Sequence, residues 1–198
     1  AGRLEPGICL HLTSAEQAER AAQQSTPEIL QSDLSGLVMD LLQWGCPDPA
    51  QLTWLNLPPA ANLAAARALL TRLGALEGER LTSRGQKMAA LGNDPRLAAM
   101  LMAAQGEDEI ATAAKLAAIL EEPPRGGSSD LAQAFSRNQG NWQQRAKQLC
   151  KRLNIRAGLP DSDKIAPLLA QAFPDRIARR RGLDGRYQLA NEIGRAHV

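Results

Sequence analysis

Apolar residues recur every three or four positions over most of the chain, which is the spacing of amphipathic helices. The first such segment spans 25–45, where Ser25 or Thr26 can cap a helix with Pro27 in its first turn, and Gly45 ends the pattern. A second segment spans about 60–73 and stops before a glycine. We therefore expect a mainly helical fold.

Short apolar pieces follow these two helices. Residues 75–76 and Leu81 flank the turn-forming sequence Glu-Gly-Glu at 77–79, and a brief helix is expected from 83 to 91. Two helices, a small β-turn element and a third helix have the order of a winged helix. We expect such a domain over residues 25–93.

The sequence changes to small-residue helices from Asp94 onward. Asp94 is placed to cap a helix with Pro95 in its first position, and the acidic sequence at 107–109 suits the start of the next helix. Alanine-rich faces permit close helix packing. Three more helices are expected at about 129–137, 141–153 and 162–173, so residues 94–174 predict a helical bundle.

Both ends of the chain carry short strand patterns. The sequence "GICLHL" at 7–12 predicts a strand, and the period falls to two in "RIARRR" and "RYQLA", which predict a hairpin around Asp184-Gly185. The final "NEIGRAHV" does not continue the pattern expected after the hairpin. We expect these last residues to be foreign sequence or the end of a truncation, and we assign them no function.

Composition excludes several classes of protein. No apolar run approaches the roughly 20 residues of a membrane span, and the N-terminus does not resemble a signal peptide, so we expect a cytoplasmic protein without membrane contact. The three cysteines lie far apart and only two histidines are present, so no metal site is expected. The sequence lacks a phosphate-binding Gly-x-x-x-x-Gly-Lys-Ser/Thr loop and a dinucleotide fingerprint, so an independent enzyme is not expected.

Charge is distributed unevenly along the chain. Residues 1–124 carry 9 Lys and Arg against 15 Asp and Glu, a balance of −6, whereas residues 125–198 carry 14 against 6, a balance of +8. An anionic partner is therefore expected at the C-terminal part. On the helix at 141–153 the basic residues lie away from the apolar arc and could contact phosphates: Arg145, Lys147, Lys151 and Arg152. The alternative is an ordinary solvated helix face.

The predicted hairpin carries a second group of basic residues. Arginine binds two phosphate oxygens at once through its planar guanidinium. A ridge of arginines in "RIARRRGLDGR" therefore predicts a nucleic-acid contact through Arg176, Arg179, Arg180 and Arg181. The alternative is an edge strand that is protected from aggregation by its charge.

Several segments together resemble one family, the DEAH-box RNA helicases. The opening "AGR" is similar to the end of their motif VI, and "PGICL" follows as in the family. "TPEILQSDLSGLVMDLLQWG", "ARALLTRLGAL", "LTSRGQKMAALGNDPRLAAMLMAA" and "DEIATAAKLAAIL" then occur in the family's order, so the resemblance covers about residues 1–120. It implies the end of a RecA-like domain at 1–24, a degenerate winged helix at 25–93, a ratchet-like bundle at 94–174 and the start of a C-terminal domain at 175–198.

The resemblance also implies roles for residues and ligands. Arg3 would be an arginine finger, a cation directed at the triphosphate during ATP hydrolysis. The full-length enzyme would bind ATP and Mg²⁺ through the RecA-like domains, which this chain lacks. The chain by itself is therefore expected to bind neither ligand and to hydrolyse no ATP. Its expected partners are single-stranded RNA or DNA and the RecA-like domains of the same protein.

Two alternatives remain open at the level of sequence. A winged-helix module that binds duplex DNA would need a basic recognition helix, and the candidate at 60–73 offers only Arg67 and Arg72. A bundle that serves only protein interaction would have no affinity for nucleic acid at any salt concentration.

Overall fold

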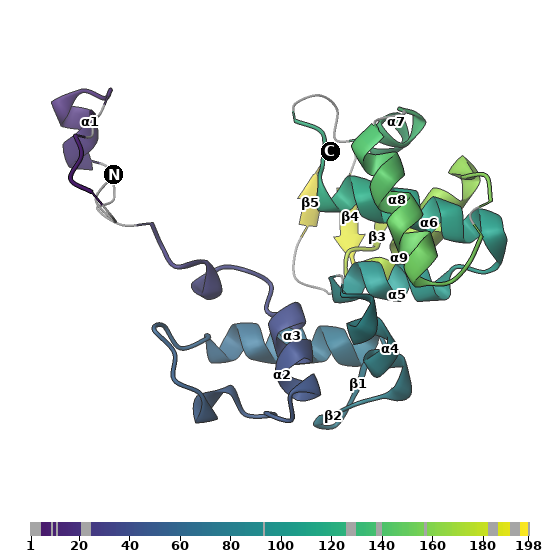
Figure 1. The fold of residues 1–198 in the computed structure, drawn as a ribbon, viewed down its shortest axis with the longest axis horizontal. Helices are drawn as coiled ribbons and strands as arrows, with labels where there is room; N and C mark the ends of the chain where they lie inside the picture. The colour runs from purple at the N-terminus through teal and green to yellow at the C-terminus, as the bar shows by residue number, and fades with distance from the viewer. Residues whose placement is uncertain are drawn as a thin grey trace.

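The protein is described by a computed structural model that covers most of the chain. The described residues are 5–8, 10, 12–20, 25–92, 94–125, 130–137, 140–156, 158–181, 186–190 and 195–197. They form a mainly helical fold with two small antiparallel sheets, as predicted from the sequence. Figure 1 shows helices α2 to α4 in one lobe and helices α5 to α9 with the second sheet in another.

The N-terminal segment lies apart from both lobes and carries the short helix α1 (Ala15–Arg20) (Figure 1). The strand predicted at 7–12 is absent at the described positions of that range, where Ile8, Leu10 and Leu12 are exposed. The prediction fails there because a strand needs a neighbouring backbone to complete its hydrogen bonds, and no described element lies beside this segment. Cys9 and His11 lie outside the described residues.

The first lobe follows the predicted order of two helices, a small hairpin and a third helix. Its elements are η1 (Glu28–Leu30), α2 (Ser35–Gln43), η2 (Pro49–Gln51), α3 (Ala60–Arg72), β1 (Leu76–Glu77), β2 (Arg80–Leu81) and α4 (Ser83–Leu91). The helix expected from about residue 25 begins only at Ser35. At this point the Asp33 carboxylate accepts the Ser35 N–H at 2.8 Å, so a local side-chain bond satisfies the first backbone donor of the helix. Gly45 follows its end with a φ of 85°, as expected of a terminating glycine.

The second lobe packs its helices around α6. Its elements are α5 (Pro95–Ala103), α6 (Gly106–Glu121), α7 (Leu131–Ser136), α8 (Gly140–Arg152), η3 (Ser162–Lys164) and α9 (Ile165–Ala172). Helix α6 contacts α5, α7, α8 and α9. The Asp94 carboxylate accepts the Arg96 N–H at 2.8 Å, so the predicted cap of α5 is confirmed.

The second sheet contains the predicted hairpin. Strand β3 (Ala178–Arg181) pairs antiparallel with β4 (Arg186–Leu189), and β4 pairs with a third strand, β5 (Arg195–His197). The turn that connects β3 to β4 lies at 182–185, outside the described residues. Strand β5 was not expected, because the sequence that contains it gave no strand pattern.

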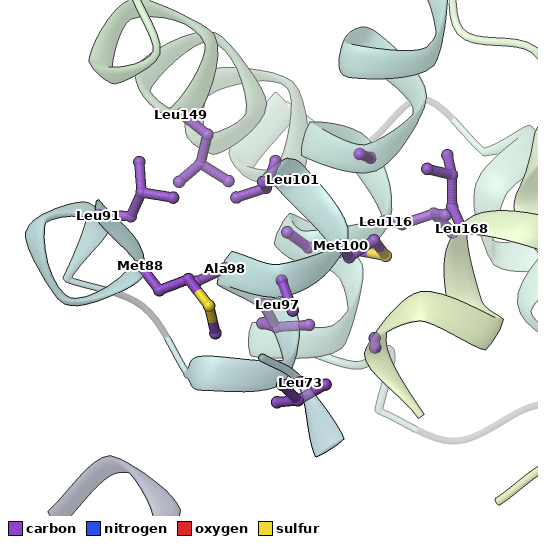
Figure 2. Close-up of a cluster of buried hydrophobic side chains, with 14 of the residues drawn as sticks. Leu73, Met88, Leu91, Leu97, Ala98, Met100, Leu101, Leu116, Leu149 and Leu168 are labelled. Carbon is purple, nitrogen blue, oxygen red and sulfur yellow. The ribbon is translucent and has the colours of Figure 1, made fainter. Parts of the chain in front are cut away.

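One hydrophobic cluster joins the two lobes. Met88 and Leu91 of α4 belong to the same buried cluster as Leu101 of α5 and Leu149 of α8 (Figure 2). Met88 and Leu149 are both completely buried. Close packing of this kind couples neighbouring elements mechanically. The division expected between 25–93 and 94–174 therefore falls across a shared core, and it stays a prediction.

Candidate nucleic-acid interface

Helix α8 supplies the first group of predicted phosphate contacts. Trp142, Leu149 and Cys150 are buried against the bundle, and the Trp142 indole N–H donates to the Glu122 carbonyl at 2.9 Å. This anchoring fixes the rotation of the helix and turns its basic residues away from the core. The four cations nevertheless have different surroundings.

Arg145 is used within the bundle. Its Nε and Nη2 atoms donate to the two carboxylate oxygens of Glu121 on α6 at 2.6 and 2.8 Å. This hydrogen bonding raises the pKa of the Arg145 guanidinium. A bidentate pair of this kind holds two helices together. Arg145 is therefore already neutralised, which removes much of its value as a phosphate contact.

Arg152 joins the two lobes. Its Nη1 atom donates to the carbonyl of Leu91, the last residue of α4, at 2.6 Å. The carbonyls at the end of a helix lack partners and carry partial negative charge, so a cation there is favourable. Arg152 thus caps the C-terminus of another helix.

Lys147 and Lys151 have a different position. Both are exposed, and they are four positions apart, so they lie on the same side of α8. In the described ranges neither side-chain ammonium makes a hydrogen bond or an ion pair. Of the four predicted residues on α8, these two lysines are the ones that keep their charge available.

The predicted arginine ridge is divided by the sheet. Successive residues of a strand point to opposite faces, so Arg179 and Arg181 lie on one face of β3 and Arg180 on the other. All three are exposed. Arg180 pairs in register with Tyr187, and Arg181 pairs with Arg186. The ridge is therefore not one surface: of its three arginines on β3, two face one way and one faces the other.

Arg176 precedes β3 and stacks on an aromatic ring. Its guanidinium carbon lies 5.1 Å from the centroid of Phe173, and its N–H donates to the Phe173 carbonyl at 3.0 Å. The same ring lies 5.2 Å from the guanidinium carbon of Arg96. Arg176 is exposed to solvent on its other side but is fixed in direction by this contact.

The sequence did not point to Arg96, which organises this region. Its guanidinium donates to both carboxylate oxygens of Asp175 at 2.5 and 2.9 Å and to the Ala172 carbonyl at 3.2 Å, and its Nε lies 3.8 Å from the Asp33 carboxylate. Hydrogen bonding from Arg96 lowers the pKa of Asp175. One signal was available: a cation in the first turn of a helix opposes the helix dipole, so it needs a compensating acid.

Arg3, the predicted arginine finger, lies outside the described residues.

Within the described ranges, no group of three His, Cys, Asp or Glu side chains could hold a metal ion. In that same part of the chain, no helix has the length and apolar character needed to cross a membrane.

Comparison with known proteins identifies the relatives of the chain. No family model matches it. It is 74% identical over 194 residues to the ATP-dependent RNA helicase HrpB of Escherichia coli, a match that covers 98% of this chain and 24% of that protein. The predicted resemblance to the DEAH-box RNA helicases is confirmed. A crystal structure of the E. coli DEAH/RHA helicase HrpB matches 96% of this chain with a TM-score of 0.80 and 75% identity.

More distant helicases match shorter parts of the chain. The ATP-dependent RNA helicase HrpA of E. coli is 29% identical over 140 residues, which cover 67% of this chain and 11% of that protein. The chain thus spans about a quarter of the length of HrpB and corresponds to its C-terminal region.

Proposed function

We propose that this chain is an accessory region of an ATP-dependent RNA helicase and that it contributes a cationic surface to the path of a single strand. The observation that carries the proposal is the 74% identity to HrpB over 98% of the chain. Residues 25–93 serve in this proposal as a degenerate winged helix and residues 94–174 as a ratchet-like bundle. The start of a further domain follows at 175–198.

The strand-binding surface is smaller than the basic composition suggests. Lys147 and Lys151 on α8 and Arg179 and Arg181 on β3 contact backbone phosphates. Arg176 and Arg180 add positive charge near β3. RNA is the proposed substrate because the relatives are named RNA helicases.

ATP hydrolysis would take place elsewhere in a longer protein. The sequence of this chain has no phosphate-binding loop, and its described residues hold no cluster of metal ligands, so they do not fit ATP with Mg²⁺. The exception is Arg3, for which we propose the role of an arginine finger toward a triphosphate bound on another domain. Replacing Arg3 by Ala in the longer helicase should abolish most RNA-stimulated ATP turnover. Turnover at the wild-type level would exclude that role.

The strand-binding proposal is tested by the salt dependence of RNA affinity. Fluorescence anisotropy of a labelled single-stranded RNA is measured against this chain at several salt concentrations. Each phosphate contact contributes about 0.7 to the slope of log affinity against log salt for a single strand. The double variant Lys147→Ala and Lys151→Ala should therefore lose about 1.4 from this slope.

Matched variants separate binding cations from structural ones. Arg145→Ala removes a cation from the same helix, but the guanidinium of Arg145 is already paired with Glu121. The salt slope of this variant should therefore stay within about 0.3 of the wild-type slope. Lys87→Ala removes an exposed lysine of α4 and should have no effect. Equal slopes for the double lysine variant and the wild type would contradict the proposed surface.

The same assay distinguishes the alternative functions. A duplex-binding winged helix would bind double-stranded DNA more tightly than single-stranded RNA, yet Arg67 of its candidate recognition helix donates to the Pro47 carbonyl. A bundle that serves only protein interaction would bind neither nucleic acid at low salt. Either result would overturn the proposal.

A further inference from the structure

A cavity opens in the second lobe, between helices α6, α7 and α8 and the segment 158–162. Its volume is about 620 Å³, which lies within the range of small-molecule sites. Phe135, Ala146 and Cys150 contribute an apolar wall, and Lys115, Gln143 and Lys147 contribute polar groups. An apolar wall with a few convergent polar groups is the usual composition of a ligand pocket.

The charges of the cavity all have one sign. Both charged residues that line it are lysines, and no Asp or Glu is among the lining residues. The Lys115 ammonium lies 4.5 Å from the centroid of the Phe135 ring. Burial lowers the pKa of Lys115, and within the described part of the chain no carboxylate pairs with it. A partly buried cation that only a ring compensates favours an anion as its partner.

The mouth of the cavity is held in place by hydrogen bonds. The Asp108 carboxylate accepts the Leu159 N–H at 2.8 Å, and the Thr112 hydroxyl accepts the Asp161 N–H at 2.8 Å. The Asp161 carboxylate accepts the Asp163 N–H at 2.9 Å. These acids of the adjoining segment are thus occupied with backbone donors. The cavity is preformed, which reduces the entropy lost when a ligand binds.

We propose that this cavity binds a small organic anion. Its phosphate or carboxylate group pairs with Lys115, and its apolar body contacts Phe135, Ala146 and Cys150. The volume admits a body of one or two rings, and the lack of acidic lining disfavours a cation. This binding goes beyond the contact with single-stranded RNA and does not depend on it.

The probe is a matched pair of ligands, 1-naphthyl phosphate and the neutral 1-naphthol, titrated by isothermal calorimetry into this chain. Naphthyl phosphate should bind saturably and at least about tenfold more tightly than naphthol, because a charge-assisted hydrogen bond contributes that much when it is shielded from water. Lys115→Ala should remove about this factor, and Lys115→Arg should restore most of it. Lys87→Ala, on α4, is the control and should leave the affinity unchanged.

A second variant tests the location without removing charge. Ala132 is exposed on α7 at the rim of the cavity, so Ala132→Trp fills the cavity without entering the core. It should abolish binding of naphthyl phosphate while the thermal unfolding temperature stays the same. No saturable binding by the wild type, or equal binding by Lys115→Ala or Ala132→Trp, would overturn the proposal.

Single-stranded RNA separates this site from the proposed function. The affinity for RNA should be the same for Ala132→Trp and the wild type, and RNA should not displace naphthyl phosphate. If RNA displaces the probe and Ala132→Trp weakens RNA binding, the cavity belongs to the strand path and the site for a free anion is excluded. If the wild type binds the probe but no RNA, only the proposed function fails.

Discussion

Asp175→Ala should lower the free energy of unfolding more than the substitution of an exposed residue would. Asp175 supplies two of the three hydrogen bonds of the Arg96 guanidinium, whose side chain is only 9% exposed. Its removal leaves the Ala172 carbonyl as the hydrogen-bond partner and Asp33 at 3.8 Å as the nearest remaining acid of the network. A buried cation without sufficient compensation is costly because water cannot solvate it.

The magnitude follows from the burial of the pair. Breaking a buried ion pair by removing one partner costs about 3–5 kcal/mol. Asp175 is 23% exposed and Asp33 remains nearby, so we expect a cost at or just below the lower limit of this range, about 2–3 kcal/mol. For a domain of this size each kcal/mol shifts the melting temperature by about 2–4 °C, so the expected decrease is roughly 4–12 °C.

The effect should depend on pH in a defined direction. Arg96 lowers the pKa of Asp175 in the folded state, so the unfolded state binds the proton more readily. The stabilisation is therefore complete above the ordinary aspartate pKa of about 3.9 and is lost as the pH falls through the lower folded value. The difference in unfolding free energy between wild type and Asp175→Ala should narrow at acidic pH.

Urea unfolding followed by circular dichroism at pH 7 and pH 3 measures this difference. Glu79→Ala, in the exposed turn of the first lobe, is the control and should change the free energy by less than about 0.5 kcal/mol. Arg96→Met combined with Asp175→Ala should cost less than the sum of the single changes. A loss below about 0.5 kcal/mol for Asp175→Ala, or a difference that does not narrow in acid, would refute the reasoning.

Three further substitutions test the joints between elements. Gly85→Ala would place a Cβ against the Ala75 carbonyl and should cost about 1–3 kcal/mol in urea unfolding; a neutral result would contradict the close packing of α4. Arg152→Ala should cost about 1 kcal/mol through the lost bond to Leu91 without changing the salt slope of RNA binding, and a changed slope would assign it to the strand instead. Asp94→Ala should cost about 1 kcal/mol by thermal melting, and an unchanged melting temperature would show that the cap contributes nothing.

The helices and the hairpin could be predicted because local signals set them. Asp94 and Pro95 start α5, a glycine follows the end of α3, and the period of two identifies β3 and β4. The start of α2 could not be predicted in this way. Ser25 and Pro27 suit a helix start, but the same signals suit the one-turn η1, and the α-helix begins only at Ser35, where the Asp33 carboxylate accepts the backbone N–H.

The use of each basic side chain could not be predicted, because its partner is distant in sequence. Arg145 pairs with Glu121, 24 residues away, and Arg152 bonds to Leu91, 61 residues away. Helical periodicity identifies the solvent-facing side of α8 but carries no information about these neighbours. The division of the arginine ridge, by contrast, follows from the alternation of side chains along a strand, and applying that alternation to Arg179, Arg180 and Arg181 would have predicted it.

The two kinds of cation have different uses on α8. Arg145 and Arg152 make directed bonds to other elements, whereas Lys147 and Lys151 make none in the described ranges. Arginine suits such joints because its planar fork loses little entropy when it bonds, and lysine suits a solvated surface because its compact charge is strongly hydrated. Replacing the arginines of α8 should therefore lower stability with little effect on RNA, and replacing its lysines should do the opposite. If replacing Arg145 or Arg152 changed the salt dependence of RNA binding, this division between arginines and lysines would be contradicted.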